Sequence, residues 1–181
     1  AYDPAMSSAA CGELEALRMD DGETRATPEA KGKSLRGAAS GGFVDLVVTF
    51  LEAGADVEFV HMGFTPLMTA ARGGHAGAIE VLVQRGQANV EATDELGATP
   101  LILAAQGGHG QAIDALVRAG ANVDAKKKSG YTALLVAAQN GHAQAVDALV
   151  RGGANVEVKQ NGFNALLMAA PYGHAQAVDA R

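Results

Sequence analysis

The stretch Gly63-Phe-Thr-Pro-Leu67 decides the fold, because variants of it return three times further along the chain. The copies begin at Gly97 (Gly-Ala-Thr-Pro-Leu), Gly130 (Gly-Tyr-Thr-Ala-Leu) and Gly162 (Gly-Phe-Asn-Ala-Leu). The four glycines lie 34, 33 and 32 residues apart. A period of this length is typical of short units that stack into a solenoid, and not of a single folded core.

The residues around each copy recur as well. Each copy continues with an Ala-Ala pair and a Gly-His pair, and complete copies close on Ala-Asn-Val or Ala-Asp-Val. The Ala-Ala pairs begin at Ala70, Ala104, Ala137 and Ala169, the Gly-His pairs at Gly74, Gly108, Gly141 and Gly173, and the closing triplets at Ala55, Ala88, Ala121 and Ala154. Chance is a poor explanation for several linked signals at one period.

Local chemistry predicts two helices in each unit. Thr65 can cap a helix start, and Pro66 follows at the first helical position, where a missing N–H costs nothing. After the Gly-His pair, apolar residues such as Ile79, Leu82 and Val83 fall at i, i+3 and i+4. This apolar stripe can be buried only by stacking against neighbouring units.

These features together resemble the ankyrin repeat. The resemblance covers residues 31–181, whereas residues 1–30 fit it more loosely. It implies an all-α, ankyrin-type helix-turn-helix solenoid with short β-turn or loop tips. The single array divides into a divergent capping repeat (1–30), repeats 31–62, 63–96, 97–129 and 130–161, and an incomplete C-terminal repeat (162–181). In the 31–62 repeat, Lys33-Ser-Leu35 stands in place of Thr-Pro-Leu.

Composition narrows the classes of function. The chain has 181 residues, a net charge of −6 and one cysteine, with no apolar run near the roughly 20 residues of a membrane span. We therefore expect no membrane insertion and an intracellular, cytoplasmic location, with the nucleus left open. The acidic balance argues against nucleic acid as a partner. The basic run Lys126-Lys-Lys128 is interpreted as a solvated loop tip.

Features that suggest catalysis or metal binding are weak. The histidines His75, His109, His142 and His174 occupy one position of each repeat. Stacked helices lie about 10 Å apart, whereas zinc needs its ligands about 2 Å from the ion, so these histidines are expected to be structural. Gly32-Lys33-Ser34 lacks the first glycine of a phosphate loop, and Cys11 has no Cys-x-x-Cys partner. We predict no enzyme, no catalytic residue, no metal and no cofactor.

The resemblance implies that a protein partner docks on the concave face. Two sets of positions would form this face: the turn tips around the first glycine of each unit, and the two residues after Ala-Ala. The tip set is His61, Met62, Phe64, Glu95, Leu96, Ala98, Lys128, Ser129, Tyr131, Gln160, Asn161 and Phe163. The second set is Arg72, Gly73, Gln106, Gly107, Gln139, Asn140, Pro171 and Tyr172.

Aromatic residues are concentrated at these positions. Phe64, Tyr131, Phe163 and Tyr172 are half of the chain's eight aromatics, and clustered aromatics are common anchors of protein interfaces. The alternative is that each aromatic packs on the next tip and stiffens the array. If the aromatics are anchors, Tyr131→Ala should weaken partner binding by more than roughly 1 kcal/mol and leave folding intact.

The sequence departs from the family pattern in four ways. The histidine that commonly follows Thr-Pro-Leu and links adjacent turns by hydrogen bonds is replaced, so that inter-repeat network should be absent and the stack softer. The replacing residues are Met68, Ile102, Leu135 and Leu167. The first and last tips are one residue shorter than the middle two and should differ in shape. An extra residue near Gln87 should lengthen the end of the preceding helix. The acids after the closing triplets, Glu58, Glu91, Asp124 and Glu157, should supply charge to the loops.

The sequence therefore favours a non-catalytic protein-binding scaffold or adaptor. The main alternative is a regulatory or targeting segment of a larger enzyme, channel or ubiquitin-ligase adaptor, and a third is a pure spacer. No small-molecule substrate is expected, because shallow stacked grooves seldom enclose a ligand. The array is expected to be a monomer, or to self-associate weakly through its incomplete C-terminal repeat.

Overall fold

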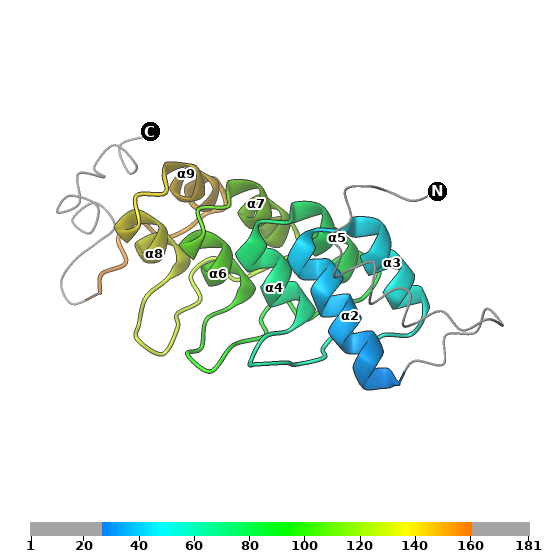
Figure 1. The fold of residues 1–181 in the computed structure, drawn as a ribbon. Helices are drawn as coiled ribbons and strands as arrows, with labels where there is room; N and C mark the ends of the chain where they lie inside the picture. Colours follow the sequence, from blue (N-terminus) through cyan, green and yellow to red (C-terminus); the bar gives the residue numbers. More distant parts are fainter. Residues whose placement is uncertain (1–26, 161–181) are drawn as a thin grey trace.

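The structure is a computed structural model that describes residues 27–160. Eight helices lie in this part of the chain, and they form four helix-turn-helix units (Figure 1). The helices are α2 (Pro28–Gly41), α3 (Val44–Glu52), α4 (Pro66–Gly73), α5 (Ala76–Gln84), α6 (Pro100–Gln106), α7 (Gly110–Arg118), α8 (Ala133–Gln139) and α9 (Ala143–Arg151). The expected all-α solenoid is confirmed.

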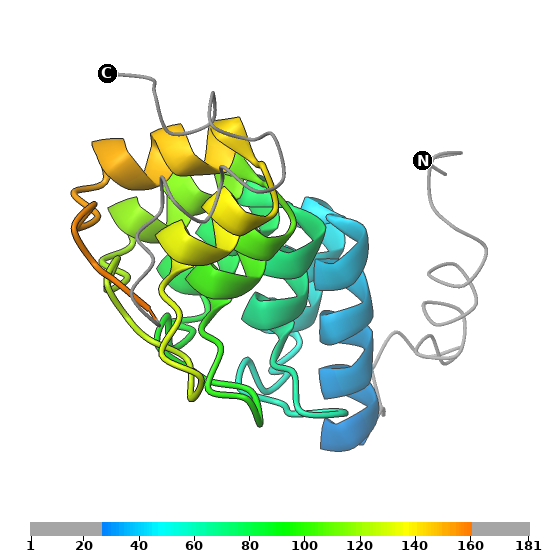
Figure 2. The same cartoon turned by 90° about the vertical axis from the view of Figure 1, so that its left-hand side faces the viewer.

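The helices stack in two layers. The first helices of the units, α2, α4, α6 and α8, contact one another in that order, and the second helices, α3, α5, α7 and α9, do the same. The loops that connect successive units project together to one side of the two layers (Figure 2). Two isolated β-bridges lie within these loops, His61 with Phe64 and Lys126 with Thr132.

Threonines begin the first helices, as the sequence predicts. The Thr65 hydroxyl accepts a hydrogen bond from the Met68 amide at 3.3 Å, and the same bond recurs at Thr99 and Thr132. α2 differs from the expectation, because it begins at Pro28 after a Thr27 cap and has 14 residues, against 8 in α4. The segment Lys33-Ser-Leu35 therefore lies inside a helix and not at its start.

The core runs continuously through the stack. The Ala-Ala pairs at 70–71, 104–105 and 137–138 have no exposed surface, so the first helices can approach closely. In the second helices the i and i+3 positions of the stripe are buried, for example Ile79 and Leu82, while the i+4 residue Val83 is half-buried. The stripe is thus narrower than the sequence predicts, because its last position lies at the edge of the interface.

The extra residue near Gln87 does not lengthen a helix, contrary to the sequence expectation. α5 has nine residues, the same length as α7 and α9. The loop after the helix takes up the insertion, where Gln87 has a φ of 57°. A helix cannot gain one residue here without rotating its buried stripe by about 100°, the angle per residue of an α-helix.

None of the helices described between residues 27 and 160 combines the length and the apolar character that a membrane crossing requires.

Candidate functional site

The first loop tip is a tight two-residue turn. His61 and Phe64 exchange backbone hydrogen bonds of 3.1 and 3.2 Å, and the two residues between them, Met62 and Gly63, have φ values of 54° and 77°. Positive φ at both central positions is typical of a type I′ turn, which favours Asn and Gly. Met62 is therefore an unusual choice, and its side chain is 82% exposed.

The next two tips each carry one more residue. The Asp94 amide donates to the Ala98 carbonyl at 3.1 Å, and Lys127 donates to Tyr131 at 3.0 Å. The Asp94 carboxylate closes its loop by accepting hydrogen bonds from the amides of Leu96 and Ala98 at 2.9 and 2.8 Å. The expectation that the first tip differs in shape is confirmed, and the last tip is described only up to Gln160.

Neighbouring tips contact one another directly. The Lys128 amide donates to the Leu96 carbonyl at 3.0 Å, and Gln160 Nε2 donates to the Ser129 carbonyl at 2.7 Å. At the other end, the Glu95 side chain lies against Gly63. We call the resulting line of residues the tip row: Met62, Glu95, Leu96, Lys128, Ser129 and Gln160.

The aromatics of the predicted site are less exposed than expected. Phe64 and Tyr131 are half-buried and pack against the hydrophobic core. A cation also covers each ring: the Arg72 guanidinium carbon lies 4.9 Å from the centre of Phe64, and Lys127 Nζ lies 5.3 Å from that of Tyr131. Truncating Tyr131 should therefore also cost stability. The most exposed large apolar residues between 27 and 160 are instead Met62 and Leu96, the latter 68% exposed.

The second predicted set lies at the carboxyl ends of the first helices. Arg72, Gln106 and Asn140 are exposed there, and Gln139 is half-buried. Arg72 joins the two sets, because its side chain reaches Phe64. Of the other predicted positions, Gly73 and Gly107 are exposed, Ala98 is buried and His61 is half-buried. Asn161, Phe163, Pro171 and Tyr172 lie outside the described residues.

The histidines link successive repeats. Nε2 of His75 lies 2.9 Å from the Ser40 carbonyl, Nε2 of His109 lies 3.1 Å from that of Arg72, and Nε2 of His142 lies 3.0 Å from that of Gln106. A carbonyl oxygen can only accept, so Nε2 carries the proton in each case. The prediction of a structural role is supported for these three, and His174 lies outside the described residues.

The acids after the closing triplets also link repeats. Glu58 accepts a hydrogen bond from the Asn89 amide and Glu91 from the Asn122 amide, both at 2.7 Å. Asp124 accepts one from the Asn155 amide at 2.9 Å. Beyond the charge that the sequence analysis expects them to supply, these acids therefore connect adjacent repeats. Apolar packing is therefore not the sole substitute for the hydrogen bonds of the histidine that commonly follows Thr-Pro-Leu, because the histidines of the Gly-His pairs and these acids also join adjacent repeats by hydrogen bonds.

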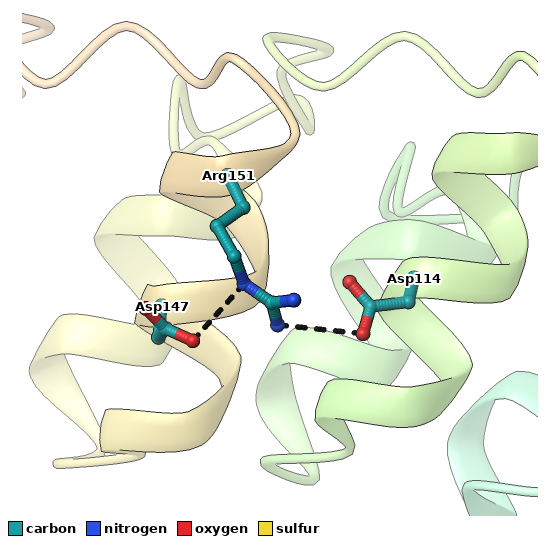
Figure 3. Close-up of polar contacts among 3 residues, drawn as sticks. All are labelled: Asp114, Asp147 and Arg151. Atoms are coloured by element: carbon teal, nitrogen blue, oxygen red, sulfur yellow. Dashed lines mark hydrogen bonds and ion pairs between the residues drawn. The ribbon is translucent and has the colours of Figure 1, made fainter.

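The opposite face of the stack carries ion pairs between second helices. Arg118 of α7 pairs with Glu80 of α5 at 2.7 Å. Arg151 of α9 lies between Asp114 of α7 at 3.4 Å and Asp147 of its own helix at 3.1 Å (Figure 3). These groups are largely exposed, so each pair stabilises the fold by roughly 1 kcal/mol or less. In the part of the chain that the structure describes, no group of three or more His, Cys, Asp or Glu residues could hold a metal ion.

Comparison with models of protein families places this sequence among known repeats. The family described as Ankyrin repeats (3 copies) matches two overlapping stretches of the chain, residues 35–127 and 104–180. These stretches include all four helix pairs except the first turns of α2. A comparison with curated proteins finds no match.

Proposed function

Because the chain belongs to the ankyrin repeat family, whose repeats are generally protein–protein interaction modules, we propose that it is a non-catalytic scaffold or adaptor that binds a partner protein. The partner would dock on the concave face, across the tip row and the carboxyl ends of the first helices. Domains of this family are typically non-catalytic, which agrees with the lack of any catalytic signature in the sequence.

The observation that carries the proposal is the exposure of Met62 and Leu96. Both are large apolar side chains at adjacent loop tips, 82% and 68% exposed. Met62 also holds a left-handed backbone conformation, with a φ of 54°, which costs a residue with a Cβ about 1 kcal/mol or more. A strained, exposed methionine contributes little to the stability of the stack. Contact with a partner would explain why this residue stands here.

The surrounding residues suit an interface core and rim. Phe64 and Tyr131 add half-buried aromatic surface next to the exposed tips. Arg72, Gln106 and Asn140 offer donors and acceptors on the same face, and Arg, Tyr and Phe are enriched at interfaces. The tips are already tied to one another by the hydrogen bonds described above, so docking needs little ordering of the loops.

A capture experiment tests the proposal. The full chain is immobilised and incubated with cell lysate, in parallel with a Met62→Ser/Leu96→Ser variant. A Val44→Ser/Val150→Ser variant is the matched control, because Val44 and Val150 are exposed valines of the second helices. We expect a protein that the parent and the control retain and the tip variant loses, with a loss in binding free energy of roughly 1–2 kcal/mol.

Circular dichroism of all three chains controls for folding. If the tip variant keeps the parent's helicity and still captures every protein that the parent captures, the proposed docking face is wrong. If the Val44→Ser/Val150→Ser control loses the partner instead, docking takes place on the second helices.

A further inference from the structure

We propose that the partner presents an extended segment in which apolar side chains are followed by a run of carboxylates. This inference rests on the proposed function, since it names the chemistry of the partner for the same face. It comes from the order of side chains along the tip row and in the loop residues beside it, which changes from apolar to basic toward the C-terminal repeats.

The lysines of the later loops are the first observation. Lys126, Lys128 and Lys159 are exposed, and within residues 27–160 no carboxylate lies within ion-pair distance of them. The arginines at the ends of the second helices behave differently, because Arg85, Arg118 and Arg151 each face a carboxylate of the preceding repeat. The three arginines are thus paired within the stack, whereas Lys126, Lys128 and Lys159 are available to a partner.

The position of these lysines next to the exposed apolar tips is the second observation. The hydrogen bond from the Lys128 amide to the Leu96 carbonyl, 3.0 Å long, places the two residues side by side. Met62 lies one tip further toward the N-terminus, and Lys159 precedes Gln160, which bonds to Ser129. Tips about 10 Å apart are spanned by about three extended residues each, so a segment of about 9–12 residues would cover the row.

The acid of the tip row, Glu95, determines the direction of the segment. Glu95 is exposed between Met62 and Leu96, so carboxylates of a partner would be repelled at that end and attracted at the lysine end. A nucleic acid fits this pattern less well. Its phosphates carry charge along their whole length, whereas the lysines that lack an ion-pair partner lie at one end of the row, and exposed Met62 and Leu96 would contribute little to phosphate binding.

A selection experiment tests the inference. A library of random 12-residue peptides displayed on phage is selected on the full chain. The enriched peptides are then synthesised, and their affinity is measured for the parent and for two variants with equal charge change. The test variant is Lys126→Gln/Lys128→Gln/Lys159→Gln, and the control is Arg85→Gln/Arg118→Gln/Arg151→Gln. A 20-nucleotide single-stranded DNA is measured in the same way.

We expect enriched peptides with Asp or Glu clustered on one side of one or two apolar residues. At low salt, their affinity should fall by about tenfold or more in the lysine variant and by less than about twofold in the arginine control. Their affinity for the parent should also fall when salt is added. Peptides without an acidic cluster, peptides bound equally by the lysine variant, the absence of any enriched peptide, or DNA bound more tightly than the peptides would each overturn the inference.

The two proposals fail in distinguishable ways. If the lysine variant still captures the lysate partner that the Met62→Ser/Leu96→Ser variant loses, the inference of an acidic partner segment is wrong and the proposed docking face is supported. If neither variant changes the capture of the partner, both proposals are wrong.

Discussion

At the scale of single residues, Gln87 has a backbone conformation for which the other repeats use glycine. Its φ is 57°, and Gly54, Gly120 and Gly153, at the equivalent loop position, have φ values of 74°, 88° and 88°. A left-handed conformation costs a residue with a Cβ about 1–2 kcal/mol, and the extra freedom of an unfolded glycine offsets about 0.5–1 kcal/mol of that. We therefore predict that Gln87→Gly raises the free energy of unfolding by about 0.5–1 kcal/mol, measured by urea denaturation. A lower free energy of unfolding would mean that the Gln87 side chain stabilises this loop.

At the scale of elements, the histidine series holds successive helix pairs together, and two glycines allow this to be measured. A Cβ added at Gly108 would lie 2.8 Å from the ring of His142 in the next repeat, whereas one added at Gly120 would meet nothing within 4 Å. Both glycines have a left-handed backbone, with φ values of 77° and 88°, so the conformational cost of alanine is similar, about 1 kcal/mol.

We therefore predict that Gly120→Ala lowers the free energy of unfolding by about 1 kcal/mol and that Gly108→Ala lowers it by about 1–3 kcal/mol more, as overpacking typically does. Equal losses in the two variants would show that the histidine ring moves aside freely and that this contact does not couple the repeats.

At the scale of the whole molecule, the fold is a line of units in which each helix pair packs mainly on its neighbours. The acid series, the histidine series and the outer ion pairs all connect one repeat to the next. Stability in such an array is approximately a sum of unit and interface terms. The tip row depends on the same interfaces, because its order of side chains exists only while the repeats stay in register.

Much of this arrangement could be predicted from the sequence, because a period and its helix signals are local. The Thr65-Pro66 start, the buried Ala-Ala pairs and the difference between the first tip and the next two follow from residue type and spacing alone. The hydrogen-bond partners of the repeated polar residues cannot be predicted in this way, since a pattern identifies Glu91 or His109 without identifying the atom that each contacts in a neighbouring repeat. The start of α2 shows the same limit. Thr27-Pro28 is the threonine–proline pair that begins the helix, whereas alignment of the repeats placed the helix start at Lys33.

The half-burial of Phe64 and Tyr131 could not be predicted either. Exposure at a loop tip depends on how closely the neighbouring chain folds back, and in these two loops the ring at the end of the turn packs against the core. The residue before the glycine faces solvent instead, which moves the exposed apolar surface to Met62 and Leu96.

Site-specific photo-crosslinking tests the central claim, binding through the tip row, most directly. A benzophenone amino acid is placed singly at Met62, Leu96 or Ser129, and at Val44 or Val150 as outer-face controls, in the full chain. After irradiation in lysate, the account predicts that the three tip positions crosslink to the same protein and the two controls do not. A partner captured from Val44 or Val150, and not from the tips, would contradict it.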